Sequence, residues 1–204
     1  MRGNPRLPPD DFQSRILPIT RVGGIFYRCA HAKRPLLDWD ARETSRFSHP
    51  TLPFPVLYLA AGKFTAFWEC FGDELNDQPQ GEKALSASHA LSSRRWIRFS
   101  VSPLLRVADV NDAGTLRAMG ADGGSFLADY KSTQRWAEAL MQHPTKLDGI
   151  RYRSRLDNDQ NCLAVFGRPQ LRRARKRLQP EREASLLHDV EFLLFLAEQD
   201  IALL

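Results

Sequence analysis

Short β-type segments constrain the fold of this chain more than any other sequence feature. Runs of mostly β-branched, aromatic and aliphatic residues stand between glycines, prolines and polar residues, which is the pattern of short strands. These runs are Ile25–Cys29, Val56–Ala60, Arg95–Val101, Leu104–Val110, Ile150–Ser154 and Asn161–Phe166. Only a few helical segments separate them, so the sequence predicts an α+β domain.

Two segments have helical rather than strand periodicity. Within 63–71 the large apolar residues fall at helical spacing and form one face, namely Phe64, Phe67, Trp68 and Phe71. Glu69 lies off this face, close to the junction with the preceding strand. Residues 131–142 form the second predicted helix, with Trp136 on its apolar side and Pro144 ending it. The apolar faces of both helices are therefore expected to lie in the core.

The composition along the chain divides its 204 residues into three parts. We expect residues 1–20, which are rich in proline, to form an N-terminal arm, and residues 21–168 to form the main domain. Residues 169–204 read as a basic linker and an apolar C-terminal helix that packs on the domain or on a partner chain. The net charge is +5, but residues 183–204 carry five acids and no Lys or Arg, so residues 1–182 carry +10. Such a body can bind anions.

Several functional classes lack their sequence signals. The three cysteines, Cys29, Cys70 and Cys162, have no metal-type or disulfide-framework spacing, and the five histidines form no HExxH pair, so no metal site is expected. No GxSxG or Walker-type loop occurs. No apolar run is long enough to span a bilayer, and residues 1–20 lack the apolar core of a secretory signal. We therefore expect a soluble protein of the reducing cytoplasm, without membrane contact.

A dispersed set of polar residues carries the candidate chemistry: Arg28, Arg46, Tyr58, Glu69 and Ser154. Taken singly, an arginine at a strand end or a glutamate on a helix is usually a solvated surface residue. Together they provide two planar cations for anions, an aromatic face, a carboxylate and a hydroxyl. This combination suits a nucleotide pyrophosphate beside a ribose.

The order of these residues resembles a known family. Tyr27-Arg28, Ser45-Arg46-Phe47 and the run from Pro55-Val56-Leu57-Tyr58 to Ala66-Phe67-Trp68-Glu69 resemble the front half of the RES domain. Ser132-Thr133-Gln134-Arg135-Trp136-Ala137, then Asp148-Gly149-Ile150-Arg151-Tyr152-Arg153-Ser154 and Asn161-Cys162-Leu163-Ala164-Val165-Phe166, resemble its back half. The resemblance covers residues 24–166. The chain departs from many members beside Arg46, where Thr44-Ser45 and Phe47 replace a glycine pair and a tryptophan.

The resemblance implies a fold and a function. RES domains are toxins of bacterial toxin–antitoxin pairs, with a split, twisted β-core like that of ADP-ribosyltransferases, here with flanking helices and a C-terminal helix. Characterised members cleave the nicotinamide–ribose bond of NAD by phosphorolysis or hydrolysis. NAD is thus a substrate and no cofactor is expected, although inorganic phosphate can be a co-substrate. The usual partner is a helix-turn-helix antitoxin that blocks the NAD cleft.

The resemblance also implies roles for individual residues. Glu69, Arg46 and Ser154 are the expected catalytic residues, with Glu69 stabilising oxocarbenium character on the ribose and Ser154 hydrogen-bonding the substrate near the scissile bond. Arg28 and Arg46 are expected to bind the pyrophosphate or an attacking phosphate. Tyr58 and Phe47 complete the expected NAD-binding set.

Two other functions stay open from the sequence. The same cleft could transfer ADP-ribose to a protein, as some family members are reported to do. A non-catalytic regulator could instead bind nucleotides or nucleic acid through the basic run after Arg168. The apolar C-terminal segment leaves a homo-oligomer possible.

Overall fold

In the part of the chain that the computed structural model describes, six strands form one sheet, and a pair of short strands lies apart from it. The structure describes residues 6–39, 45–48, 54–127, 129–167 and 176–204. The main sheet contains β1 (Thr20–His31), β2 (Val56–Ala60), β4 (Arg94–Asp109), β5 (Gly149–Arg153), β6 (Asn161–Phe166) and β7 (Leu178–Ser185), in the order β1-β2-β6-β5-β4-β7. The small sheet pairs β3 (Ala84–Leu85) with β8 (Ala202–Leu203).

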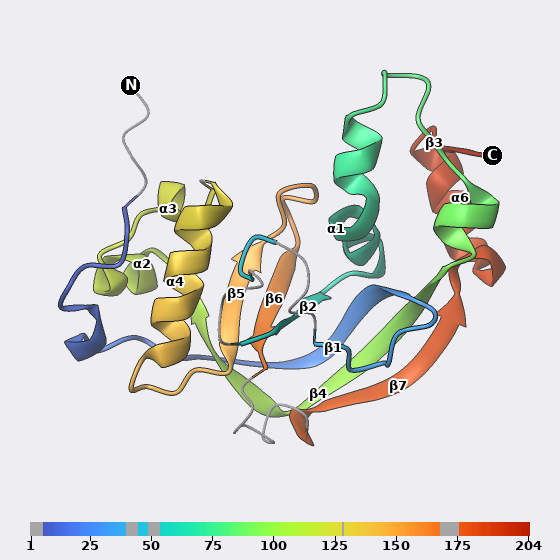
Figure 1. Ribbon diagram of the computed structural model, residues 1–204. Coiled ribbons are helices and arrows are strands. Elements are labelled where there is room, and N and C mark those ends of the chain that lie inside the picture. The colour runs from blue at the N-terminus through green and yellow to red at the C-terminus, as the bar shows by residue number, and fades with distance from the viewer. Residues whose placement is uncertain (1–5, 40–44, 49–53, 128, 168–175) are drawn as a thin grey trace.

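The helices gather at the two ends of the sheet (Figure 1). They are α1 (Lys63–Asn76), α2 (Ala113–Met119), α3 (Gly123–Leu127), α4 (Tyr130–Gln142) and α6 (Val190–Glu198), with short helical turns at Phe12–Ser14, Ala87–Leu91 and Leu186–His188. Helices α2, α3 and α4 lie at one end, and α1 and α6 lie at the other. The predicted α+β class is confirmed. Among the described residues, no helix combines the length and the apolar character that a bilayer crossing requires.

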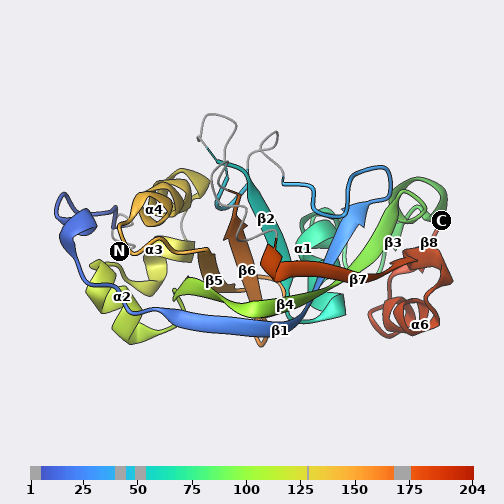
Figure 2. The same ribbon diagram turned by 90° about the horizontal axis from the view of Figure 1, so that it is seen from below.

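The two longest strands, β1 and β4, run antiparallel across the whole molecule (Figure 2). Their register shifts between Val22 and Gly24, and Gly24 has a φ of 105°, a conformation that side chains with a Cβ rarely adopt. The sequence predicts two strands, Arg95–Val101 and Leu104–Val110, in the region of β4. One strand forms instead, because β1 follows β4 on both sides of the interruption.

Strands β1 and β2 meet at a single aligned pair, Tyr27 and Ala60, and then separate. Strand β2 instead pairs along its whole length with β6. Strand β4 links the two parts of the sheet, because it pairs with β1 and also, through Val107–Asp109, with β5. The divergence of β1 from β2 opens the side of the sheet on which α1 lies, and this opening positions the site described below.

Successive side chains of a strand point to opposite faces of the sheet, so the buried apolar residues form two clusters. Leu57 and Leu59 of β2 and Leu163 and Val165 of β6 join the cluster enclosed by the curved sheet, together with Ile97 and Phe99 of β4. The intervening residues face the helices and belong to the larger cluster, which includes Val56, Tyr152, Cys162 and Ala164. The polar candidates Tyr58 and Ser154 have the same parity as residues of this helix-covered face.

The N-terminal segment packs on the domain in its described part, which begins at Arg6. Phe12 and Leu17 are buried, and the ring of Phe12 meets that of Trp136 edge-on at 5.3 Å between centroids. The indole N–H of Trp136 donates to the carbonyl of Arg6 at 2.7 Å. Residues 6–17 therefore cover the outer side of α4.

The C-terminal region differs from the expected basic linker and single helix. Residues 168–175, the first half of the basic run, lie outside the described residues. Leu178–Ser185 is not linker: it forms the edge strand β7, antiparallel to β4. Only Val190–Glu198 of the apolar tail is α-helix, since the chain then turns at Asp200 and ends in β8.

Helix α6 packs on its own domain, one of the two arrangements that the sequence left open. Phe192 is fully buried against Phe67 and Trp96, and Phe195 stacks on Phe64 with 4.2 Å between ring centroids. Lys63 at the start of α1 lies 2.6 Å from Asp189 at the start of α6. The C-terminal segment thus fixes the beginning of the helix that carries Glu69.

Candidate active site

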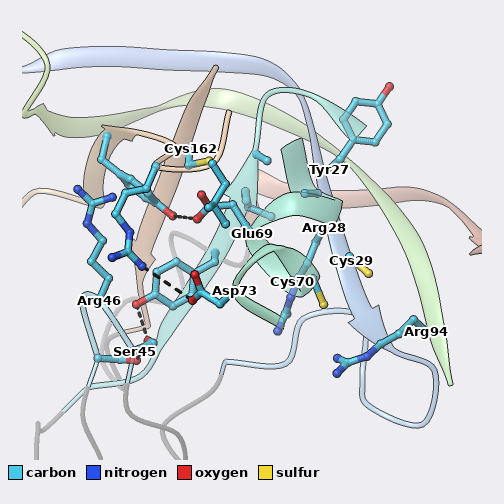
Figure 3. A pocket seen from close by; sticks show the side chains of 18 of the residues that line it. Tyr27, Arg28, Cys29, Ser45, Arg46, Glu69, Cys70, Asp73, Arg94 and Cys162 are labelled. Carbon is cyan, nitrogen blue, oxygen red and sulfur yellow. Dashed lines mark hydrogen bonds and ion pairs between the residues drawn. The ribbon is translucent and has the colours of Figure 1, made fainter. Parts of the chain in front are cut away.

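A pocket of about 320 Å³ opens where β1 and β2 separate (Figure 3). Its walls come from the second half of β1, from β2, from α1, from residues 45–48 and from the β5–β6 region. The volume lies within the range of small-ligand sites, which is about 300–1,000 Å³. The pocket is thus assembled from segments that are far apart in sequence.

Glu69 is the carboxylate at the centre of this pocket. It lies on α1, off the aromatic face that Phe67 and Phe71 bury, and its side chain is exposed to the pocket. Ser154 Oγ donates to Glu69 Oε1 at 2.6 Å, and the hydroxyl of Tyr152 donates to Glu69 Oε2 at 3.2 Å. Two buried hydroxyls therefore hold both carboxylate oxygens in place.

Arg46 lies beside this carboxylate and is almost completely buried. Its Nε and Nη2 donate to the carbonyl of Phe126, and its Nη1 donates to the carbonyl of Arg153 at 3.3 Å. The guanidinium also lies over the ring of Tyr152, 4.8 Å from its centroid. Burial lowers the pKa of Arg46, while the nearby Tyr152 and Glu69 oppose this shift.

The backbone contacts limit what Arg46 can offer a ligand. A guanidinium has five N–H bonds, and backbone carbonyls accept three of them here. At most two remain for an anion. Arg46 therefore acts as a fixed positive charge next to Glu69 rather than as a mobile clamp.

Residues 45–48 form a tight turn that Tyr58 and α4 hold in place. The Tyr58 hydroxyl accepts the backbone N–H of Phe47 at 2.9 Å and lies 2.8 Å from Ser45 Oγ. Gln134 donates to the carbonyls of Ser45 at 2.8 Å and of Ser48 at 3.0 Å. Burial raises the pKa of Tyr58, so its hydroxyl stays protonated at neutral pH. The turn that carries Arg46 is thus fixed from both sides.

Positive charge lines both ends of the pocket. Arg28 of β1 donates to the carbonyl of Asp38 at 2.8 Å and lies near Arg94 at one end (Figure 3). Arg46 and Arg155 are at the other end, where Arg155 lies 4.0 Å from Asp73. Glu69 and Asp73 are the acids between them. The arrangement suits a dianionic ligand with polar hydroxyls in its middle.

Comparison with models of known protein families identifies the family of this chain. The RES domain model matches residues 21–186, which includes every strand of the main sheet except the first residue of β1. The chain belongs to the RES domain family. Among curated proteins, none matches it.

One solved structure similar to this RES domain comes from the crystal structure of the M. tuberculosis MbcT–MbcA toxin–antitoxin complex. The match has a TM-score of 0.67 and 20% sequence identity, and it covers 87% of this chain and 93% of the other. At this identity the similarity establishes a shared fold.

The RES fold brings most of the predicted site residues together. Arg28, Arg46, Tyr58 and Glu69 all line the pocket. Ser154 lies behind Glu69 instead, fully buried, and its hydroxyl also accepts the backbone N–H groups of Leu156 and Asp157. Its position is that of a residue that orients Glu69, not of one that contacts a ligand.

Phe47 was expected to bind NAD, but its side chain does not line the pocket. Its side chain is fully buried and packs edge-on against Tyr152, 5.0 Å between ring centroids. It is absent from the described pocket wall. Phe47 therefore supports Tyr152 from the core.

Sequence reasoning missed Tyr152 and Gln134 as parts of the site. Tyr152 lies on β5, two residues before Ser154, which directly follows the strand, and this spacing places both side chains on the same side of the chain. Strand periodicity was therefore a usable signal for Tyr152. Gln134 lies on α4 and gave no comparable signal, because its partners are backbone carbonyls of a distant turn.

Proposed function

We propose that this protein is an NAD-consuming toxin of a bacterial toxin–antitoxin pair, which cleaves the bond between nicotinamide and ribose by phosphorolysis or hydrolysis. The observation that carries the proposal is the Glu69 carboxylate, held by Ser154 and Tyr152 in a pocket lined by Arg28 and Arg46. Membership of the RES domain family supports it.

The proposed chemistry follows from the charges around Glu69. When the nicotinamide–ribose bond breaks, positive charge develops on the ribose ring, as in glycoside cleavage. An oriented carboxylate stabilises that charge more than it stabilises the ground state, and it accepts hydrogen bonds from ribose hydroxyls. Neutral nicotinamide leaves with the bonding electron pair. Water or inorganic phosphate then bonds to the ribose carbon.

The arginines would bind the two phosphates of NAD. Arg28 at one end of the pocket can supply planar, charge-assisted hydrogen bonds to a phosphate oxygen. Arg46, with at most two N–H bonds left, would act mainly through its charge. In this proposal NAD is consumed as substrate, and the enzyme needs no bound cofactor.

A partner and a compartment complete the proposal. A chain with a similar fold occurs in the crystal structure of a toxin–antitoxin complex, which supports a cognate antitoxin here. We propose that a helix-turn-helix antitoxin covers the pocket and that the protein acts in the cytoplasm, where NAD is available.

Purified protein incubated with NAD, with and without inorganic phosphate, tests the activity. We expect nicotinamide release, and strict dependence on phosphate would identify a phosphorylase. Glu69→Gln should abolish release, whereas Glu74→Gln, the same exchange on α1 outside the pocket wall, should retain it. Absence of nicotinamide release from the wild-type protein would refute the proposal. Labelled ADP-ribose on protein would identify a transferase instead.

A further inference from the structure

Two thiols face each other in the wall of the pocket. Cys29 lies on β1 and Cys70 on α1, and their side chains lie next to each other in the pocket wall (Figure 3). Both line the pocket and both are partly exposed, so a small reagent that enters the pocket can reach them. Each follows a residue of the proposed NAD site directly: Cys29 follows Arg28, and Cys70 follows Glu69.

We propose that Cys29 and Cys70 are a site of thiol oxidation, at which a low-molecular-weight disulfide joins β1 to α1 and closes the pocket to substrate. The effect on catalysis rests on the proposed function, but formation of the bond does not. The observation that carries the proposal is that two thiols from two packed elements, β1 and α1, lie next to each other in the wall of one pocket (Figure 3).

The surroundings make Cys70 the attacking group. The hydrogen bond from Cys29 lowers the pKa of Cys70, and the nearby positive charges of Arg94 and Arg28 act in the same direction. The same contact and burial raise the pKa of Cys29. A thiolate, not a thiol, is the nucleophile in disulfide exchange. Cys29 then serves as the resolving thiol.

The exchange with oxidised glutathione balances in two steps. The Cys70 thiolate attacks one sulfur of oxidised glutathione, which forms a mixed disulfide and releases one glutathione thiolate. Cys29 loses its proton to solvent and attacks the Cys70 sulfur, which forms the intramolecular disulfide and releases the second glutathione. The two protein thiols lose two electrons, and oxidised glutathione gains them.

The arginines also select the oxidant. Glutathione carries a net negative charge, and Arg28 and Arg94 stand beside the thiol pair. Attraction to these cations concentrates an anionic disulfide in the pocket. Cys162 lines the same pocket but should stay reduced, because burial first and the nearby Glu69 second raise its pKa far above neutrality.

Closure would disturb catalysis through α1. A disulfide requires about 2.05 Å between its sulfurs and a dihedral near 90°, so the backbones of β1 and α1 must shift when the bond forms. Glu69 is the neighbour of one bridged residue, and Arg28 is the neighbour of the other. A shift of about 1 Å in a catalytic group can cost roughly a hundredfold in rate.

Mass spectrometry of the full chain in a glutathione redox buffer tests bond formation without any activity measurement. The ratio of reduced to oxidised glutathione is chosen so that Cys162 stays reduced, which its reaction with a thiol reagent after unfolding shows. At this ratio we expect the chain to lose 2 hydrogens and to yield a Cys29–Cys70 cross-linked peptide. Cys162→Ser should form the same cross-link. Cys29→Ser should stop at the mixed disulfide on Cys70. Failure of the wild-type protein to form the cross-link would overturn the proposal.

Nicotinamide release then tests the consequence, with each protein compared with its own reduced form. The oxidised forms of the wild-type and Cys162→Ser proteins should release nicotinamide about a hundredfold more slowly, because the disulfide displaces a catalytic group. Dithiothreitol should restore the rate. Cys29→Ser and Cys70→Ser cannot form the Cys29–Cys70 disulfide, so neither should show the reversible loss of activity that this disulfide causes. A cross-link that leaves the rate unchanged overturns the closure. A reduced protein that cuts no NAD but forms the cross-link refutes the proposed function alone.

Discussion

Ser154 Oγ lies 2.6 Å from Glu69 Oε1 and donates a hydrogen bond to it, from a fully buried position behind the pocket wall. This contact links the end of β5 to α1. Because the same oxygen accepts the N–H groups of Leu156 and Asp157, the orientation of the hydroxyl is fixed by the backbone. Glu69 therefore has one defined position although its side chain is exposed.

Replacing Ser154 with Ala tests this orientation. We expect kcat for nicotinamide release to fall by roughly a hundredfold, because an unrestrained carboxylate loses its alignment with the ribose. KM should change little, since Ser154 is not part of the pocket wall. The control is Thr65→Val, which removes the 2.6 Å hydrogen bond from Thr65 to Asp157 in the same loop without touching Glu69. Equal losses of kcat in both variants would contradict a role through Glu69.

The two arginines should differ in what they contribute. Arg28→Ala should raise KM for NAD by roughly tenfold or more, because a hydrogen bond to a charged group contributes about 1.5–3 kcal/mol. Its effect on the Tm should be smaller than that of Arg46→Ala, since Arg28 is half-buried and Arg46 is almost completely buried. Arg46→Ala should lower both the activity and the Tm, because it removes the donor to two backbone carbonyls and a cation from the ring of Tyr152. Steady-state kinetics and thermal melts measure the difference. An Arg46→Ala protein with unchanged Tm would contradict the structural role.

Gln134 should control the turn at residues 45–48. Gln134→Leu removes the side-chain donor to the carbonyls of Ser45 and Ser48, and each carbonyl then keeps only the backbone hydrogen bond from the other residue. Each lost hydrogen bond should cost about 0.5–1.5 kcal/mol. We expect faster amide exchange in a peptide that contains Ser45–Ser48, and a higher KM for NAD. Gln142→Leu is the matched control on α4, since the side chain of Gln142 makes one solvent-exposed hydrogen bond, to Glu138, among the described residues. Exchange that rises equally in both variants would indicate a general effect on the helix.

The sequence predicted the elements of the sheet that have apolar patterns, and it missed those that do not. Strands β2, β5 and β6 were recognisable because their buried residues form short β-type runs. Strand β7 was not, since Leu178 is its only fully buried residue and Pro180 and Glu181 lie within it. Its position depends on the free edge of β4 and on ion pairs such as Arg95 with Glu183, 2.6 Å apart. Such an edge strand leaves no periodic signal in its own sequence.

The candidate site was predictable by residue type but not by orientation. Glu69 was identifiable because it lies off the aromatic face of its helix and close to the preceding strand, and the motif order indicated Arg28, Arg46 and Tyr58. The inward position of Phe47 and the placement of Ser154 behind Glu69 depend on how the turn at 45–48 meets β5. Those contacts join residues about a hundred positions apart, and no local pattern encodes them. The ADP-ribosyltransferase-like arrangement of the strands stays a prediction.

Helix α6 should be essential for stability. Phe192→Ala removes a fully buried ring that packs against Phe67 and Trp96, and large-to-small changes of this kind cost about 3–5 kcal/mol. Leu194→Ala, on the same helix but 61% exposed, should change stability by less than about 0.5 kcal/mol. Urea unfolding measures both. If Phe192→Ala has no larger effect than Leu194→Ala, the C-terminal segment does not contribute to the core as described.

Alkaline pH should destabilise the fold through Tyr152. Burial, followed by the negative charge of Glu69, raises the pKa of Tyr152 well above the ordinary tyrosine value of about 10. Above that pH the unfolded chain releases the phenolic proton while the folded protein retains it, so the folded state binds more protons and stability falls as pH rises. Each such group contributes a slope of up to about 1.4 kcal/mol per pH unit. Tyr152→Phe keeps the ring against Arg46 and Phe47 but cannot ionise. The slope of unfolding free energy between pH 10 and 11, measured with urea, should be smaller in this variant by about one proton. An identical slope in both proteins would show that Tyr152 ionises as readily in the folded protein as in the unfolded chain.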